Sequence, residues 1–78
     1  MKWIVENHLT DVTIGVVEAD SAREAIDAAY QAKGWKGFAD AREQRATAAQ
    51  EHEIMARRID ENGVEFGPYL GYATGEIK

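Results

Sequence analysis

The stretch DSAREAIDAAYQAKG, residues 20–34, decides the fold because it carries the pattern of an amphipathic helix. Small and apolar residues recur every three or four positions, which places them along one side of a helix. These residues are Ala22, Ala25, Ile26, Ala29 and Tyr30. The polar residues between them then point outward, and they are Arg23, Glu24, Asp27 and Gln31. A helix with one apolar side must bury that side against another element.

The ends of this helix are marked as clearly as its apolar side. Ser21 is followed three residues later by Glu24, the spacing of a capping box in which each side chain bonds a free backbone N–H. Lys33 suits the negative end of the helix dipole, and Gly34 is a natural residue just after the last turn. The sequence therefore predicts a helix over residues 21–33.

Two short segments before this helix are rich in β-branched and aromatic residues. We expect strands over 2–7 (KWIVEN) and 12–19 (VTIGVVEA), paired antiparallel through a turn at 8–11. Alternation would place one set of side chains on a common face of the second strand, namely Val12, Ile14 and Val16. Gly15 would mark a bulge or a close backbone approach.

A second, weaker helix is predicted over residues 39–50. Asp40 and Glu43 repeat the i, i+3 spacing of the first helix start, with Asp40 as the N-cap. The segment is polar, so we expect a largely exposed helix with a narrow buried stripe. The stripe would consist of Phe38, Ala41, Ala46 and Ala49.

The last third of the chain carries a hairpin signal. Asn62-Gly63 is the preferred pair of a type I′ turn, in which both residues have positive φ. The flanking strands would be EIMARRI, residues 53–59, and a second strand that begins at VEFG, residues 64–67. A two-residue turn sets Glu61 opposite Val64, Asp60 opposite Glu65 and Ile59 opposite Phe66. Pro68 cannot donate to a ladder, so the last strand is an edge strand or bends there.

A competing interpretation continues the second helix through QEHEIMARRI, residues 50–59, which also fits a helical period. If this segment is a strand, Arg57 and Arg58 point to opposite faces. We then expect one of them to pair with Glu65.

Together these elements predict an α+β fold of the order ββααββ. A small antiparallel sheet of three or four strands packs with one strong and one weaker helix. We expect a single domain over residues 1–78, because a 78-residue chain has room for one thin core. Residues 73–78 are expected to form a loose tail.

Composition narrows the kind of partner. The chain has no cysteine, and no apolar run near its start is long enough for a signal peptide or a membrane span. We therefore expect a soluble protein of the cytoplasm. The net charge of −5 argues against free nucleic acid as the main ligand, since phosphate neutralisation needs clustered Lys and Arg. It fits a basic protein partner, although solubility alone also explains it.

Residues that could support catalysis are scarce. Ser21 is the only serine and is better used as a helix cap than as a nucleophile, which would need a base and an oxyanion site. His52 lies in EHE between Glu51 and Glu53, but adjacent residues do not face each other on a helix or a strand. We therefore expect no enzyme, no cofactor and no metal site.

The segment KGWKGF, residues 33–38, allows two interpretations. Trp35 and Phe38 can fold under the joint between the two helices, because aromatic rings bury much apolar area in a small domain. Alternatively, they contact a partner together with the flanking lysines. Tyr69 and Tyr72 pose the same choice between covering the core and docking a partner.

Several segments together carry a resemblance to a known group of proteins: MKWIV at the start, EADSAREAI, MARRIDENGV and the final YLGY. In this order the chain resembles small phage and mobile-element anti-CRISPR proteins that inhibit type I (Cascade-type) CRISPR complexes. The resemblance covers about half the chain, and residues 35–52 depart from it. It implies a protein without catalysis that binds a subunit of the crRNA complex and stops target DNA from binding.

On this hypothesis, acids supply complementarity to a basic channel and an aromatic residue supplies the anchor. The candidate partner-binding residues are Trp35, Phe38, Glu43, Glu51, Asp60, Glu61, Glu65 and Tyr69. A second hypothesis is a small regulatory or antitoxin-like interaction module, dimeric through an edge strand. A third is direct nucleic-acid binding through Lys33, Trp35, Lys36 and the arginines, which predicts strong salt dependence.

Overall fold

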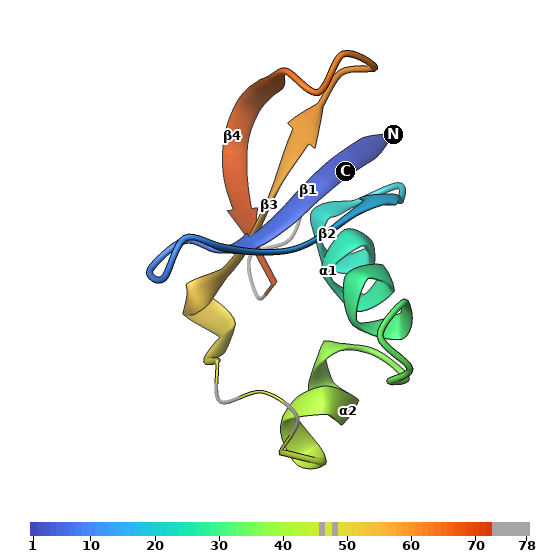
Figure 1. Cartoon of the computed structure of the whole chain (residues 1–78), viewed down its shortest axis with the longest axis vertical. Coiled ribbons are helices and arrows are strands. Elements are labelled where there is room, and N and C mark those ends of the chain that lie inside the picture. Colours follow the sequence, from blue (N-terminus) through green and yellow to red (C-terminus); the bar gives the residue numbers. More distant parts are fainter. Residues whose placement is uncertain (46, 48, 73–78) are drawn as a thin grey trace.

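A computed structural model describes residues 1–45, 47 and 49–72 of the chain. It has a four-stranded antiparallel sheet and two α-helices in the order ββααββ, so the predicted α+β class is confirmed (Figure 1). The elements are β1 (Lys2–Asn7), β2 (Val12–Glu18), α1 (Ala22–Gln31), α2 (Phe38–Glu43), the short 3-10 helix η1 (Glu51–Glu53), β3 (Ile54–Ile59) and β4 (Glu65–Gly71). The tail expected over 73–78 lies outside the described residues.

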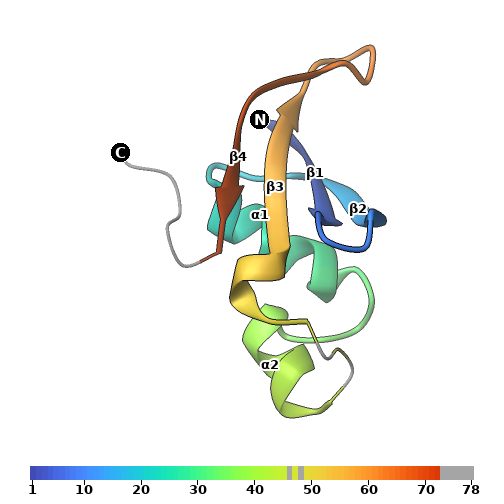
Figure 2. The same ribbon diagram turned by 90° about the vertical axis from the view of Figure 1, so that its left-hand side faces the viewer.

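The strands lie in the order β2-β1-β3-β4, and every neighbouring pair is antiparallel. The two hairpins are therefore joined through β1 and β3, which come from opposite ends of the chain. Helix α1 packs on one face of the sheet, and α2 and η1 lie at one end of it (Figure 1). Figure 2 looks onto the other face, with β3 in front of α1, and no described helix covers it.

The core lies between the sheet and α1. Trp3 and Val5 of β1 and Ile54 of β3 are fully buried beside Ile26 of α1. Burial of such side chains is the main stabilising term of a small domain. The Trp3 indole N–H also donates to the Ala19 carbonyl oxygen at 3.0 Å, so the polar edge of the largest buried ring is satisfied.

Helix α1 confirms the central prediction. The Glu24 N–H donates to the Ser21 hydroxyl at 3.3 Å, and the Asp20 N–H donates to the Glu24 carboxylate at 3.2 Å. The two side chains therefore bond reciprocally, as in a capping box, except that the Glu24 carboxylate accepts from the Asp20 N–H rather than from that of Ser21. The helix ends at Gln31, short of the predicted residue 33, and Gly34 then takes a φ of 101°.

The predicted face of β2 is wrong at Val16 because the strand contains a bulge. Val5 pairs with Gly15 and Glu6 with Thr13, which leaves Ile14 as an extra residue. Ile14 consequently packs on the core, whereas its expected companions Val12 and Val16 are 56% and 49% exposed. At Gly15 a Cβ would lie 3.8 Å from that of Ala29, an ordinary van der Waals distance, so the strand packs on α1 here without needing glycine.

Helix α2 is much shorter than the predicted 39–50, because Arg45 adopts a left-handed φ of 60° just after its end. The predicted N-cap is also wrong. Gly37 occupies that position, and the Asp40 carboxylate instead accepts the Lys36 N–H at 3.0 Å. Of the expected stripe, Phe38 and Ala41 are buried, Ala49 is partly buried, and Ala46 lies outside the described residues.

A side chain of α1 explains why α2 begins early. The Asp27 carboxylate accepts the Phe38 N–H at 2.9 Å, so it satisfies a free donor of the first turn of α2. A Cβ at Gly37 would lie only 2.9 Å from the same Asp27 oxygen, so any larger residue there would push the Asp27 carboxylate out of place. Asp27 was expected to point into solvent, and the structure corrects this.

Residues 54–59 form a strand, which confirms that interpretation over the helical one. The turn type, however, is wrong. Gly63 has a φ of 81° but Asn62 does not have a positive φ, and the Gly63 N–H donates to the Asp60 carbonyl. This is a three-residue loop with a glycine bulge, in which the Asp60 carboxylate accepts the N–H groups of Asn62 and Val64 at 2.9 Å each.

The register shifts accordingly. Ile59 pairs with Glu65 and Arg58 with Phe66, and the Asp60 N–H donates to the Val64 carbonyl. The expected pairing of Asp60 with Glu65 is therefore wrong, and two acids do not face each other. Pro68 does lie in an edge strand, where its missing N–H breaks no ladder.

Candidate protein-binding surface

The face of the sheet turned away from α1 carries the strongest candidate site. Since Trp3 and Val5 face α1, their neighbours along β1 point the other way. The register with β2 and β3 then assigns the side chains of this surface, which we call the open face. Its central members are Ile4, Glu6, Val16, Met55, Arg57, Glu65 and Tyr69, and Lys2 and Ile59 lie on the same face.

Arg57 lies at the centre of the open face. Its Nε donates to the Gly67 carbonyl at 2.8 Å, and its Nη1 lies 3.5 Å from a Glu65 oxygen. The guanidinium also stacks 5.1 Å from the centre of the Tyr69 ring. The predicted pairing of one arginine with Glu65 is therefore confirmed, and Arg58 lies on the other face, over Phe66.

The Tyr69 hydroxyl lies between two carboxylates. It donates to Glu65 at 3.2 Å, and its pKa is raised, first by a hydrogen bond with Glu6, then by lost hydration and the charges of both acids. A phenol hydroxyl has one proton, so it cannot donate a full hydrogen bond to both carboxylates at once. The two carboxylates therefore keep acceptor capacity beside Tyr69, a residue that is 44% exposed, and this suits an incoming guanidinium or ammonium group.

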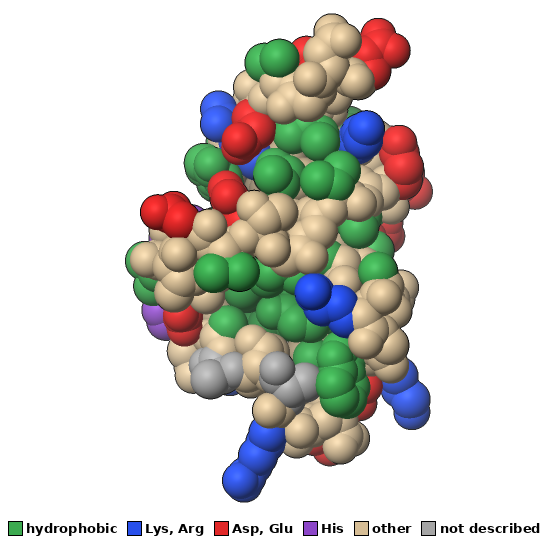
Figure 3. Space-filling model, in the orientation of Figure 1, with side chains coloured by type: hydrophobic (Ala, Val, Ile, Leu, Met, Phe, Trp, Pro, Cys, Tyr) green, Lys and Arg blue, Asp and Glu red, His purple; other side chains and the backbone are tan. Residues whose placement is uncertain are grey.

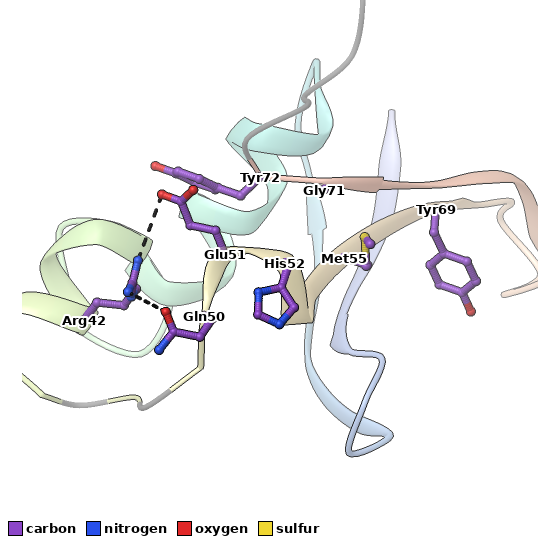
Figure 4. A pocket seen from close by; sticks show the side chains of 8 residues that line it. All are labelled: Arg42, Gln50, Glu51, His52, Met55, Tyr69, Gly71 and Tyr72. Carbon is purple, nitrogen blue, oxygen red and sulfur yellow. Dashed lines mark hydrogen bonds and ion pairs between the residues drawn. The ribbon is translucent and has the colours of Figure 1, made fainter.

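A pocket of about 740 Å³ adjoins the open face. It is lined by Arg42, Gln50, Glu51, His52, Met55, Tyr69, Gly71 and Tyr72. Arg42 donates to Gln50 at 3.1 Å and lies 4.0 Å from Glu51, so it spans the wall between α2 and η1. Figure 4 shows these three residues on one side of the pocket, with Met55 and Tyr69 on the other.

The two aromatic residues proposed around the helix joint have different environments. Phe38 is 1% exposed and contacts the rings of Tyr30 and Tyr72, with centroids 5.2 and 5.0 Å away. Trp35 is partly buried against the same core. The packing interpretation therefore describes Phe38 fully and Trp35 in part, and Tyr72 belongs to the core as well.

The predicted acids do not form one surface. Glu43 ends α2 and Glu51 faces Arg42 near one end of the molecule, whereas Asp60 and Glu61 lie in the β3–β4 turn at the other end (Figure 1). Seen from this direction, acidic side chains lie mainly around the margin and hydrophobic ones in the middle (Figure 3). The structure brings only Glu65 together with a predicted aromatic partner, Tyr69.

Sequence reasoning missed Ile4, Glu6, Val16 and Met55 as site residues. Alternation within KWIVEN does place Ile4 and Glu6 on one face. Which face lacks a helix follows only from the strand order, which places β1 and β3 at the centre of the sheet.

The histidines contribute to structure at the edge of this region. The Nε2 atom of His8 lies 2.9 Å from the His52 carbonyl oxygen, so the two histidine-containing segments meet. Within the described part of the chain, no group of three or more His, Asp or Glu side chains could hold a metal ion. None of the described helices is long and apolar enough to cross a membrane.

No family model, curated protein or solved structure matches this chain.

Proposed function

We propose that the protein acts by binding, as a non-enzymatic inhibitor that docks on a basic subunit of a type I CRISPR surveillance complex and blocks target DNA. The arrangement of Tyr69 between Glu6 and Glu65 on the open face carries this proposal. It supplies an acidic, aromatic receptor for one cationic side chain of the partner. The identity of the partner rests on the resemblance to anti-CRISPR proteins.

The surroundings of Tyr69 support docking of a protein surface. Ile4, Met55 and Val16 give the open face apolar area, and an apolar centre with polar contacts is typical of protein interfaces. Arg57 neutralises only part of the local acidity, because both Glu6 and Glu65 lie near the Tyr69 hydroxyl. A chain with a net charge of −5 is also steered toward a positive partner.

Co-elution of the purified protein with a purified type I effector complex, followed by a target-DNA shift assay, tests the proposal. The double variant Glu6→Gln, Glu65→Gln removes two charges from the open face. We expect it to weaken complex binding by about tenfold or more, as loss of charge pairs in an interface does. The matched control, Glu43→Gln with Glu61→Gln, removes two exposed charges outside the open face.

The outcomes separate the partner from the surface. No co-elution with any type I complex overturns the proposed partner. If the control pair weakens co-elution as much as the open-face pair does, the proposed surface is wrong, and the acids outside the open face contribute equally to binding.

A second candidate function, a small regulatory or antitoxin-like module, is favoured by one observation, the free edge of β2.

A further inference from the structure

The two edges of the sheet differ in a way that bears on self-association. The edge strand β4 contains Pro68, has Gly67 at a φ of 76°, and shifts register against β3. Proline and bulges are devices that keep an edge from pairing with another chain. The edge strand β2 also has a bulge, at Ile14, and like β4 it has one charged residue, Glu18, but it contains no proline, so each of its residues keeps a backbone N–H.

The backbone groups that β2 leaves free can be assigned. The Ala19 N–H donates to the Met1 carbonyl at 2.9 Å, so these two residues form a hydrogen-bonded pair. Bonded and non-bonded pairs alternate along an antiparallel ladder, so Val17 and Gly15 also bond to β1. The N–H and C=O groups of Val16 and Glu18 therefore point away from the sheet, and no described strand lies beyond them.

We propose that a second copy of the chain pairs with this edge, β2 against β2 and antiparallel. The two copies are related by a two-fold axis, the commonest symmetry of homodimers. The Ile14 bulge limits the regular edge to residues that follow it, so Val16 lies at or next to the axis. Val16 is 49% exposed, and pairing covers part of it.

Charge permits a second copy at this place, although two chains of net charge −5 repel each other overall. Glu18 is the one charged side chain of β2, so few like charges meet where two β2 strands pair. Pairing centred on Val16 puts Glu18 opposite Ile14 of the other copy, and pairing centred on Val17 puts it opposite Val16. Neither register sets two acids face to face, which would be destabilising.

The resulting dimer has one continuous eight-stranded sheet. Its two-fold axis is perpendicular to the sheet, so both α1 helices lie on one side and both open faces on the other. This inference goes beyond the proposed function, since the dimer forms from the chain alone and needs no other protein.

Light scattering behind size exclusion, from micromolar to millimolar protein, tests the proposal. We expect the wild-type mass to rise toward twice the 8.7 kDa of one chain. Val16→Glu puts acid against acid in either register, so it should weaken dimerisation by about tenfold or more. Val64→Glu is the matched control, because Val64 is 59% exposed and lies in the β3–β4 turn. It should dimerise like the wild type.

Hydrogen exchange gives a second readout. Protection of the Val16 and Glu18 amides should rise with protein concentration, whereas the Val17 amide, bonded within the chain, should stay protected throughout. A wild-type mass of 8.7 kDa at every concentration overturns the proposal and leaves the edge to a strand of another protein. Equal loss of dimer in both glutamate variants, or no loss in either, overturns β2 as the contact.

Discussion

The Tyr72 hydroxyl donates a hydrogen bond to the Asp27 carboxylate, 3.1 Å from Oδ1, across 45 residues of sequence. The same oxygen accepts the Phe38 N–H at 2.9 Å. One side chain of α1 therefore holds both the start of α2 and the residue that follows β4. Arg23 stacks 4.6 Å from the centre of the Tyr72 ring and covers this junction.

Removing Asp27 should destabilise the fold. Asp27→Ala leaves the Phe38 N–H and the Tyr72 hydroxyl without their partner, and we expect the free energy of unfolding to fall by about 1–3 kcal/mol. Tyr72→Phe removes only one bond, so a loss of about 0.5–1.5 kcal/mol is expected. Urea denaturation measures both, with Glu61→Ala as the exposed control. An Asp27→Ala curve that overlays the wild type would contradict the role of this junction.

The two aromatic residues at the helix joint should respond differently to truncation. Phe38→Ala empties a fully buried site and should cost about 3–5 kcal/mol, a large part of the stability of so small a domain. Trp35→Ala removes a partly buried ring, so we expect a smaller loss, about 1–3 kcal/mol. Trp35→Ala should also leave partner binding unchanged. Loss of binding with full stability would restore Trp35 as the partner contact.

The conformation of the β3–β4 turn can be tested by substitutions at Gly63 and Asn62. Gly63 has a φ of 81°, and no atom lies within 4 Å of an added Cβ, so Gly63→Ala is opposed only by backbone conformation. We expect a loss of about 1–2 kcal/mol in thermal or urea unfolding. Asn62→Gly should not stabilise the protein, because Asn62 does not need a positive φ. Stabilisation by that change would favour the type I′ turn instead.

Glu53 should contribute to the acid sensitivity of the fold. Its pKa is lowered, first by the hydrogen bond from the Gln50 backbone N–H at 2.7 Å and then by the Asn7 side-chain amide. A carboxyl whose pKa is lowered on folding stabilises the protein above its ordinary pKa, here 4.5, and loses that contribution as pH falls through the lowered value.

Glu53→Gln should therefore reduce the change in the free energy of unfolding between neutral pH and pH values below 4.5. Denaturation at a series of pH values measures this slope, with Glu51→Gln as the neighbouring control on the same short helix. A slope that Glu53→Gln leaves unchanged would show that its hydrogen bonds do not depend on the charge.

The sequence predicted those elements whose signals are local. Ser21, Glu24 and the small apolar residues between Ala22 and Tyr30 lie within one helix, so no distant contact was needed to predict α1. The second helix was overextended because its end depends on the left-handed conformation of Arg45, a residue type with no preference for it. The face of β2 was wrong because one extra residue, Ile14, reverses the alternation after it.

The candidate site was less predictable than the fold. The contact of Arg57 with Glu65 followed from their places on adjacent strands of a hairpin. Glu6 lies near Tyr69 only because β1 and β4 both flank β3, which local patterns do not specify. Asp27 was misjudged for a similar reason, since its partners Phe38 and Tyr72 come from two other segments.

The central position of β1 beside β3 also determines how the chain must fold. Each hairpin can close locally in about 1–10 μs, but Val5 reaches Ala56 only after the whole intervening chain has closed into a loop. The chain loses the entropy of that closure before any contact between the hairpins forms. The pairing of the two hairpins should therefore limit the rate of folding. Substitutions at Val5 or Ala56 should then slow refolding, whereas those at the Gly63 turn should mainly speed unfolding.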